Sequence, residues 1–385
     1  MKITSRFLAF LVLSTAAAFL ALTTAAPKPA SHRDFLGFVG TYTNKTESKG
    51  IYAFEFDADS GKLKAKGLAA ATTDPSWVAI HPNGKFAYAA NETGNQSTIT
   101  AFSIDVQKAK LIQLNQLPAL GQDPCHLSFD KTGKYLFAAN YSSGNIAVFP
   151  ILPDGRLGEH TAVVKNAGSL GPNKERQEGP HAHWVHVSPD NQYVFAADLG
   201  LDAILSYRFD ATKGTLTPND PPMTKLTPGA GPRHVAFSPS GKYVYVVSEL
   251  NSTVTAFQYD PGKGTLSEFQ ILATLAQDFS GRNDTAEITV HTNGKWLFAS
   301  NRGRDTITVF SISPSDGSLT SLGEFPTGGK EPRHFAIDPS GQYVLAENQN
   351  SNSITVLKID PATGALKEVA RANDIPSPVC LAFLP

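Results

Sequence analysis

Arginine, histidine and glutamate flank two neighbouring apolar runs at residues 231–250, which read GPRHVAFSPSGKYVYVVSEL. Arg233 and His234 stand before the first run, and Glu249 follows the second. A buried arginine costs desolvation unless it meets an anion, and its planar guanidinium group matches a carboxylate or a phosphate. Arg333 has the same place in a second such stretch. These arginines favour a site for an anionic or polyhydroxylated small molecule, and pairing inside the protein is the alternative.

The two apolar runs belong to a repeat. Each unit has a short strand, a turn, an alternating strand and a third strand that ends at an aromatic residue and an acid. The turns fall at Gly84, Gly133, Asn191, Gly241, Gly294 and Gly341, so the intervals are 49, 58, 50, 53 and 47 residues. A period of about 50 residues with three strong strands indicates four-stranded propeller blades rather than a helical solenoid.

The two ends of the chain supply a seventh blade. PVCLAFLP at residues 378–385 matches PRHFAIDP at 332–339, so the chain ends after one inner strand. FLGFVGTYT and GIYAFEFDADSG, within residues 35–61, have the form of a second and a third strand. A blade shared by the termini closes the ring and removes exposed sheet edges. The sequence therefore predicts an all-β, seven-bladed β-propeller in one domain, residues 35–385, with the last blade closed by N- and C-terminal strands.

The polar residues of different blades converge on one mouth of the central channel. In a hairpin, the start of the first strand and the end of the second lie at the same edge. Alignment of the units puts Trp77, His126, Trp184, His234, Glu287, His334 and Cys380 at the start of the first strand. His183, Arg233 and Arg333 come one residue earlier, and the position after the second strand holds Glu92, Tyr141, Leu199, Glu249, Arg302 and Gln349.

Residues in these columns, the equivalent positions of the aligned units, could also have structural roles. The second strands end at Asn91, Asn140, Asp198, Ser248, Asn301 and Asn348, whose side chains we expect to bond to loop backbone. Trp77 and Trp184 are expected to pack rather than to bind substrate. Glu249 and Arg302 lie in adjacent blades, so a structural ion pair between them is as plausible as a catalytic role.

The ordered motifs resemble the seven-bladed lactonase family, which includes propeller-type 6-phosphogluconolactonases and the carboxy-cis,cis-muconate lactonising enzyme. FVGTYT, GPHAHWVHVSPDNQYVFAADLGLD, GPRHVAFSPSGKYVYVVSELNSTV, AEITVHTNGKWLFASNRGRDTITVF and EPRHFAIDPSGQYVLAENQNSNSITV carry the resemblance, which covers about residues 35–385. It implies opening of a lactone ring by water, or the reverse cycloisomerisation, without a cofactor. By motif, the family's active-site residues fall on His183, Arg233, Glu249 and Arg302.

The resemblance and the residue types together suggest roles. A water must lose a proton, and the carbonyl oxygen must be stabilised as negative charge develops. Either Glu249 or His183 is the expected base, and Arg233 and Arg302 would hold the oxyanion. Further substrate contacts are expected from His126, His181, His234, Glu287, Arg333 and His334.

Metal and phosphate-loop chemistry finds no support in the sequence. No zinc-type His/Cys spacing and no glycine-rich phosphate loop occurs. Asp198, Glu249 and Glu287 could hold a metal only if the fold gathered them, since nothing in their spacing selects it. We therefore expect no metal and no cofactor. The expected partner is a small-molecule lactone or an anionic sugar acid.

The N-terminus has the form of a secretory signal. Lys2 and Arg6 precede an apolar run at 7–22, and small residues lead to a cleavage site near Ala26. This predicts a signal peptide at 1–26, a linker at 27–34, and export to a periplasmic or extracellular space without a membrane anchor after cleavage. A monomer is expected, and the lack of a basic run argues against nucleic acid. Since 6-phosphogluconolactone arises in the cytosol, export favours unphosphorylated sugar lactones.

Two cysteines and two further functions complete the expectations. Cys125 and Cys380 fall two blades apart at non-equivalent positions, too far for a disulfide, so both should be buried free thiols. Besides a hydrolase, the same arginines would suit a muconate-type lyase or isomerase. A propeller can also serve as a non-catalytic binding platform, because fold alone implies no function.

Overall fold

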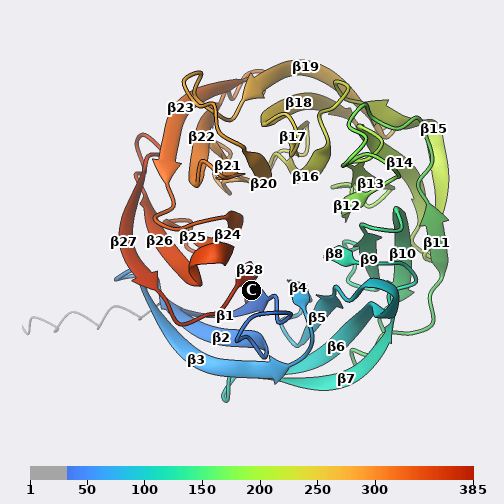
Figure 1. Cartoon of the computed structure of the whole chain (residues 1–385). Helices are drawn as coiled ribbons and strands as arrows, with labels where there is room; N and C mark the ends of the chain where they lie inside the picture. The colour runs from blue at the N-terminus through green and yellow to red at the C-terminus, as the bar shows by residue number, and fades with distance from the viewer. Residues whose placement is uncertain (1–32) are drawn as a thin grey trace, which may run out of the picture. The chain divides into compact units, whose positions relative to one another are not determined.

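The computed structural model describes residues 33–385, and this part of the chain is one unit of seven four-stranded sheets arranged as blades of a ring (Figure 1). The signal peptide predicted at 1–26 and most of the linker predicted at 27–34 lie outside the described residues. No helix within 33–385 is long and apolar enough to cross a membrane. The prediction of an all-β, seven-bladed propeller is confirmed.

The first three blades in chain order after the N-terminal strands contain β4–β15. Their bounds are β4 Pro75–Ile80, β5 Phe86–Asn91, β6 Thr98–Asp105, β7 Lys110–Pro118; β8 Pro124–Phe129, β9 Tyr135–Asn140, β10 Asn145–Pro150, β11 Ala162–Lys165; and β12 Ala182–Val187, β13 Tyr193–Asp198, β14 Ala203–Asp210, β15 Thr215–Lys225. Two 3-10 turns, η1 Gly94–Gln96 and η2 Gln349–Ser351, follow the second strands of two blades.

The next three blades contain β16–β27. Their bounds are β16 Pro232–Phe237, β17 Tyr243–Ser248, β18 Thr253–Asp260, β19 Thr265–Ala273; β20 Asp284–Val290, β21 Trp296–Arg302, β22 Thr306–Ile312, β23 Leu319–Pro326; and β24 Pro332–Ile337, β25 Tyr343–Asn348, β26 Ser353–Ile359, β27 Leu366–Ala372.

The seventh blade is shared by the two ends of the described chain. It has the order β28 (Pro378–Phe383), β1 (Asp34–Thr41), β2 (Gly50–Asp57) and β3 (Lys62–Ala71). β28 pairs antiparallel with β1, and Val39 lies opposite Leu381. Figure 1 shows red β28 beside blue β1, which closes the ring. The prediction that terminal strands complete one blade is confirmed.

Apolar side chains between neighbouring blades hold the ring together. Tyr245 and Ala256 of one blade pack with Leu297 and Phe310 of the next, and all four are fully buried. Burial of such side chains stabilises the fold by roughly 1.5–3 kcal/mol for each large one. The hairpins reverse at tight turns, and Gly241 in the β16–β17 turn has φ +70°, a left-handed conformation that glycine adopts without strain. Rigid hairpins thus fix what lies at their channel ends.

Candidate functional site

A β-bulge at the start of the inner strand turns the predicted arginines and histidine toward the channel mouth. In β16, Pro232 pairs with Ser248 and His234 with Val247, so Arg233 is the extra residue. The same irregularity occurs around His183 in β12 and Arg333 in β24. A bulge leaves one residue outside the strand ladder and re-aims its side chain. This local feature explains how an arginine inside a strand can face the mouth of the channel.

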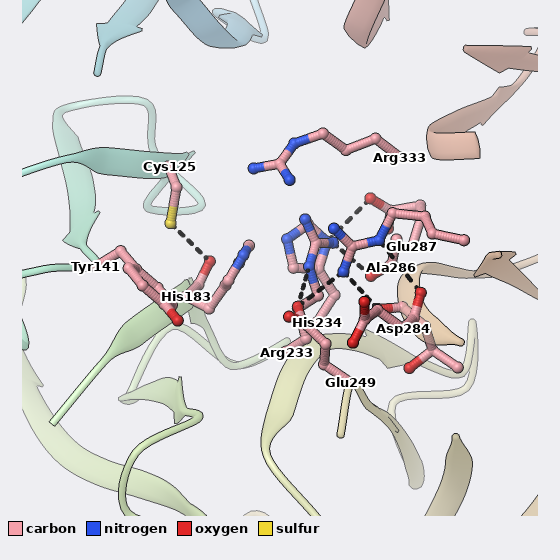
Figure 2. A network of polar contacts seen from close by, with 12 residues as sticks. Cys125, Tyr141, His183, Arg233, His234, Glu249, Asp284, Ala286, Glu287 and Arg333 are labelled. Atoms are coloured by element: carbon pink, nitrogen blue, oxygen red, sulfur yellow. Dashed lines mark hydrogen bonds and ion pairs between the residues drawn. The ribbon is translucent and has the colours of Figure 1, made fainter. Parts of the chain in front are cut away.

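The mouth of the channel contains a cavity of about 420 Å³, here called the mouth cavity. Four predicted residues line it: His183, Glu249, Arg302 and Arg333. Seven others complete its lining: Tyr42, Glu92, Cys125, Tyr141, Arg176, Arg282 and Asp284. Figure 2 shows His183, Arg333 and Glu249 extending from different strands toward this space. The fold therefore brings these four predicted residues together at one cavity.

Glu249 is the most heavily paired carboxylate of the site. Its Oε2 lies 2.9 Å from Arg302 Nη2 and 3.0 Å from Arg233 Nε, and its Oε1 is 2.5 Å from Arg176 Nη2. Burial alone would raise the pKa of Glu249, but the positive charges of Arg302, Arg233 and Arg176 outweigh it and lower the pKa to about 2. Glu249 is thus a permanent anion, and the structural ion pair with Arg302 considered above is present.

Arg233 lies buried behind Glu249 rather than on the cavity wall. Its Nη1 donates to the Ala286 carbonyl at 2.6 Å. The Nε–H is not directed at Glu249 Oε2 for a hydrogen bond, so that 3.0 Å contact is charge pairing. Burial, followed by the like charges of Arg302 and Arg333, lowers the pKa of Arg233 to about 9. Arg233 is therefore still a cation at neutral pH, and its positive charge is internally paired.

His183 is buried and neutral at the cavity. Its ring packs against His234, with centroids 5.1 Å apart, and against the edge of Tyr141 at 5.5 Å. Burial, then Arg233 and His234, lower the pKa of His183 well below its usual value. Nδ1 has no hydrogen-bond partner among residues 33–385. A buried polar atom without a partner costs about 1–3 kcal/mol, so a ligand that bonds to it would gain affinity.

A second series of hydrogen-bonded side chains, contributed by three blades, lies along the cavity wall. Arg333 Nη2 donates to Tyr42 Oη at 2.9 Å, and Tyr42 Oη donates to Glu92 Oε2 at 2.9 Å. Burial alone would lower the pKa of Arg333, but Tyr42, Glu92 and Glu249 outweigh it and raise the pKa. Burial raises the pKa of Tyr42, so its hydroxyl stays protonated. Within 33–385, Arg333 is in no ion pair closer than 4.0 Å.

Two loops contribute residues that the repeat alignment did not mark. Arg176 belongs to the segment between β11 and β12, and Arg282 to the segment between β19 and β20. Asp284, at the start of β20, pairs with Arg282 Nη2 at 2.7 Å and lies 3.9 Å from Arg176 Nη1. The sequence feature that could have indicated the first loop is the 58-residue interval between turns, the longest of the five. Long loops in compact domains are often functional. For Arg282 the sequence offered no comparable signal.

Four of the predicted substrate contacts do not line the mouth cavity. His126, His234, Glu287 and His334 are buried inside the channel and do not line the cavity. His234 Nδ1 lies 2.9 Å from Glu287 Oε2, and His334 Nδ1 lies 2.7 Å from Glu347 Oε2. The strand register gives the reason for His126, His234 and His334, because each pairs with the second strand one step past the bulge, while its bulged neighbour does not pair. Glu287 lies within the irregularity between Thr285 and Ile288, and its carboxylate contacts His234.

His181, the fifth contact predicted besides Arg333, also lies off the cavity wall. Its ring stacks on Tyr141 at 4.5 Å, and Nε2 lies 3.0 Å from Glu178 Oε1. Its backbone N–H donates to Asp198 Oδ1. Since Tyr141 does line the cavity, His181 supports that ring instead of facing a ligand itself.

The structural alternatives hold for the remaining columns. Asn140 and Asn348 donate to the loop carbonyls of Ala119 and Thr327, as expected for the strand-end column. Trp77 donates its indole N–H to Leu127 and contacts the rings of His126, His234 and His334, in agreement with a packing role. Trp184 packs in the interface between two blades.

Two further expectations concern metals and thiols. Within 33–385 no three His, Cys, Asp or Glu side chains gather in a way that could hold a metal ion. Asp198 accepts hydrogen bonds from the backbone of His181 and Leu201 instead. Cys125 and Cys380 are buried free thiols, which confirms that prediction.

The charges of the mouth cavity favour an anion. Its lining has four arginines, Arg176, Arg282, Arg302 and Arg333, against three carboxylates, Glu92, Glu249 and Asp284, a balance of +1, and buried Arg233 adds one more positive charge. Guanidinium groups held in place in a partly buried site stabilise negative charge without reorganising. The cavity is therefore suited to bind an acidic molecule or to stabilise an oxyanion that forms during a reaction.

Comparison with known proteins gives consistent matches over almost the whole propeller. The family model described as lactonase, 7-bladed beta-propeller, matches residues 37–383. A 6-phosphogluconolactonase of Bacillus subtilis is 36% identical over 350 residues, which are 91% of this chain and 98% of that protein.

Solved structures agree. A candidate 6-phosphogluconolactonase from Bacteroides fragilis superposes with a TM-score of 0.86 at 36% identity, and covers 94% of this chain and 100% of its own. The periplasmic gluconolactonase PpgL of Pseudomonas aeruginosa also gives 0.86, at 32% identity, over 92% and 99% of the two chains.

Proposed function

The chain belongs to the seven-bladed β-propeller lactonase family of carboxylic ester hydrolases, and we propose that it is an exported enzyme that opens a sugar lactone at the mouth cavity. The observation that carries the proposal is that buried Glu249 holds the guanidinium groups of Arg176 and Arg302 at the cavity wall, with Arg233 buried behind it. Such cations are suited to stabilise the oxyanion that forms at a lactone carbonyl.

The proposed reaction is acyl transfer to water. The water oxygen bonds to the lactone carbonyl carbon as a base removes one of its protons, and the carbonyl π electrons move to oxygen. Arg302 and Arg333 stabilise that oxyanion, and loss of an oxyanion donor in other enzymes costs roughly 100–1000-fold in kcat. When the carbonyl re-forms, the ring C–O bond breaks and the alkoxide takes up a proton. The product is a hydroxy acid, which ionises and releases one proton to solvent.

Glu249 fits the role of anchor better than that of base. A general base works best when its pKa lies near the working pH, whereas three guanidinium groups hold the pKa of Glu249 near 2. We assign it to keep Arg302 and Arg233 in place. His183 remains at the cavity as a neutral imidazole, whose unpartnered Nδ1 is suited to a hydrogen bond with a substrate hydroxyl or with the attacking water.

The proposed substrate is an unphosphorylated sugar lactone in the periplasm or outside the cell. The signal-like N-terminus supports export, and a structural neighbour is a periplasmic gluconolactonase. Other relatives are 6-phosphogluconolactonases, and the positive balance of the cavity would also accept a phosphate ester. The preference between the two substrate forms therefore tests the export part of the proposal separately.

The experiment is a proton-release assay with glucono-δ-lactone, its 6-phosphate and other aldonolactones, each corrected for spontaneous opening. Acceleration of at least one lactone by the wild-type protein supports the hydrolase, and a higher kcat/KM for the unphosphorylated form supports an exported role. No acceleration of any lactone would refute the hydrolase. A carboxymuconolactone assay run in parallel would then test the muconate-type lyase.

A further inference from the structure

We propose that Glu92 is the catalytic residue that takes the proton from the attacking water, and that Tyr42 and Arg333 position it. This inference rests on the lactone hydrolysis proposed above and assigns the base for that reaction. Neither the ordered motifs nor the repeat alignment gave Glu92 or Tyr42 a chemical role. Both residues line the mouth cavity.

The hydrogen bonds around Tyr42 leave Glu92 with one oxygen in use and one available. Tyr42 Oη accepts from Arg333 Nη2, so its own hydrogen is directed to Glu92 Oε2. The Arg333 guanidinium carbon also lies 5.4 Å from the centre of the Tyr42 ring. The hydrogen bond and the ring contact from Arg333 hold the Tyr42 side chain in place. The Tyr42 hydroxyl in turn orients one oxygen of the Glu92 carboxylate. Oε1 of Glu92 accepts no hydrogen bond from residues 33–385 and can accept one from water.

The contrast with Glu249 identifies which carboxylate can accept a proton. Glu249 has both oxygens against guanidinium groups, and a proton there would break three ion pairs. Glu92 forms no ion pair within the described part of the chain, and it is half-buried at the cavity wall. A proton on Oε1 of Glu92 would break no ion pair closer than 4.0 Å and no hydrogen bond within residues 33–385. Of these two glutamates, only Glu92 is arranged as a base.

The positions of the blades place Glu92 across the channel from the arginine cluster. Glu92 follows β5, and Glu249 follows β17. Their blades are three positions apart in the ring, which is the greatest separation possible among seven blades. Tyr42 follows β1 of the shared blade, between the blades of Glu92 and Arg333. A lactone between the two walls would have Glu92 on one side and the guanidinium groups of Arg176 and Arg302 on the other.

The proton balance of the step is complete without another reagent. Glu92 takes one proton from water as the oxygen–carbon bond forms and the carbonyl oxygen becomes an anion beside Arg302 or Arg333. The protonated Glu92 then gives this proton to the ring oxygen as the acyl C–O bond breaks. Glu92 returns to its carboxylate form for the next turnover.

The test compares Glu92→Gln and Glu92→Ala with the matched control Glu47→Gln, an exposed glutamate that does not line the mouth cavity. We expect Glu92→Gln to lower kcat at least about 100-fold, the usual contribution of a general base, with KM changed less than about threefold. Glu47→Gln should keep the wild-type kcat. Added formate should restore activity to Glu92→Ala in a saturable manner, which loss of a merely structural side chain would not allow.

The outcomes separate this inference from the proposed function. Rapid lactone hydrolysis by both wild type and Glu92→Gln would overturn the role of Glu92 and leave the hydrolase intact. A folded Glu92→Ala that is inactive and not rescued by formate would also overturn it. Failure of the wild type on every lactone would overturn both.

Tyr42→Phe tests the positioning role. Loss of the Tyr42 hydroxyl should lower kcat about tenfold in the wild-type background. It should have little further effect in Glu92→Gln, because the effects of residues that act through one another are not additive. Equal effects in both backgrounds would contradict the positioning role. Circular dichroism and thermal unfolding of each variant check that the fold is retained.

Discussion

Arg302 Nη2 and Glu249 Oε2 lie 2.9 Å apart and join two neighbouring blades at the mouth of the channel. The same arginine group donates to the Thr285 carbonyl of its own blade at 3.1 Å. The ion pair is buried, so it orients the guanidinium group while it also ties the blades together. A structural role therefore coincides in this pair with the catalytic role proposed for Arg302.

Replacement Glu249→Gln should cost stability, because it leaves Arg233 and Arg302 buried without their anion. Breaking one partner of a buried ion pair typically costs about 3–5 kcal/mol. We expect a loss of this size in the free energy of unfolding from urea titration at pH 7. Exposed Glu47→Gln is the control and should change that free energy by less than about 0.5 kcal/mol.

The free energy of unfolding in acid should also depend on the ionisation of Glu249. Its folded pKa of about 2 is below the usual 4.5, so its contribution is present above pH 4.5 and is lost as pH falls toward 2. The stability difference between wild type and Glu249→Gln should therefore shrink over this window. A constant difference from pH 6 to pH 2.5 would show that the pKa of Glu249 is not lowered.

The buried histidines should destabilise the protein in mild acid. Burial, then the charges of His234 and His186, lower the pKa of His126 well below 6.5. Below pH 6.5 the unfolded chain binds protons that the folded chain does not, so stability falls as pH falls. His126→Phe keeps an aromatic ring beside Trp77 and removes one titrating group. Its melting temperature should fall less between pH 7 and pH 5 than that of the wild type, and an identical slope would argue against a neutral His126.

Arg302→Lys should lower activity more than stability. Lysine retains the charge but lacks the planar fork, in which Nη2 contacts Glu249 and the Thr285 carbonyl while Nε donates to the Asp284 carbonyl. We expect kcat on the best lactone to fall about 100-fold. Arg304→Lys, in an exposed pair with Glu324, should leave kcat unchanged. A kcat for Arg302→Lys within about threefold of wild type would exclude a contact to the oxyanion.

Arg176 should contribute to substrate binding through its loop. It contacts Glu249 and lies 3.5 Å from the Tyr141 hydroxyl, yet it is one third exposed. Arg176→Gln should raise KM for an anionic or polyhydroxylated lactone several-fold with a smaller change in kcat, as measured by initial rates. Lys174→Gln in the same loop is the control. A fall in kcat with KM unchanged would instead place Arg176 in the chemical step.

The fold could be read from the sequence because each blade repeats the same local rules. Gly or Asn at the turns, alternating strands and Asn, Asp or Ser at the strand ends mark each unit independently, so one irregular blade does not hide the pattern. The motifs also placed His183, Glu249 and Arg302 at one mouth, since equivalent positions of a propeller share an edge.

The sequence could not predict how far down the channel each side chain lies, or which loop residues extend to the site. Alignment placed Arg233 and His234 next to each other, but only the bulge decides that neighbouring residues of β16 face different surroundings. Tyr42 occupies the position after the second strand of the shared blade, the same position as Glu92. It was overlooked because that blade is split between the two ends. Arg176 reaches the site from a loop whose path no repeat predicts.

The most direct test of the central claim is ring opening of glucono-δ-lactone in water labelled with heavy oxygen, followed by mass spectrometry of the product. Wild-type protein should accelerate formation of the acid above the spontaneous rate and place one labelled oxygen in its carboxylate, and Arg302→Lys should lose most of that acceleration. An unaccelerated rate, or an enzyme-formed product without the label, would contradict attack of water on the lactone carbonyl at the mouth cavity.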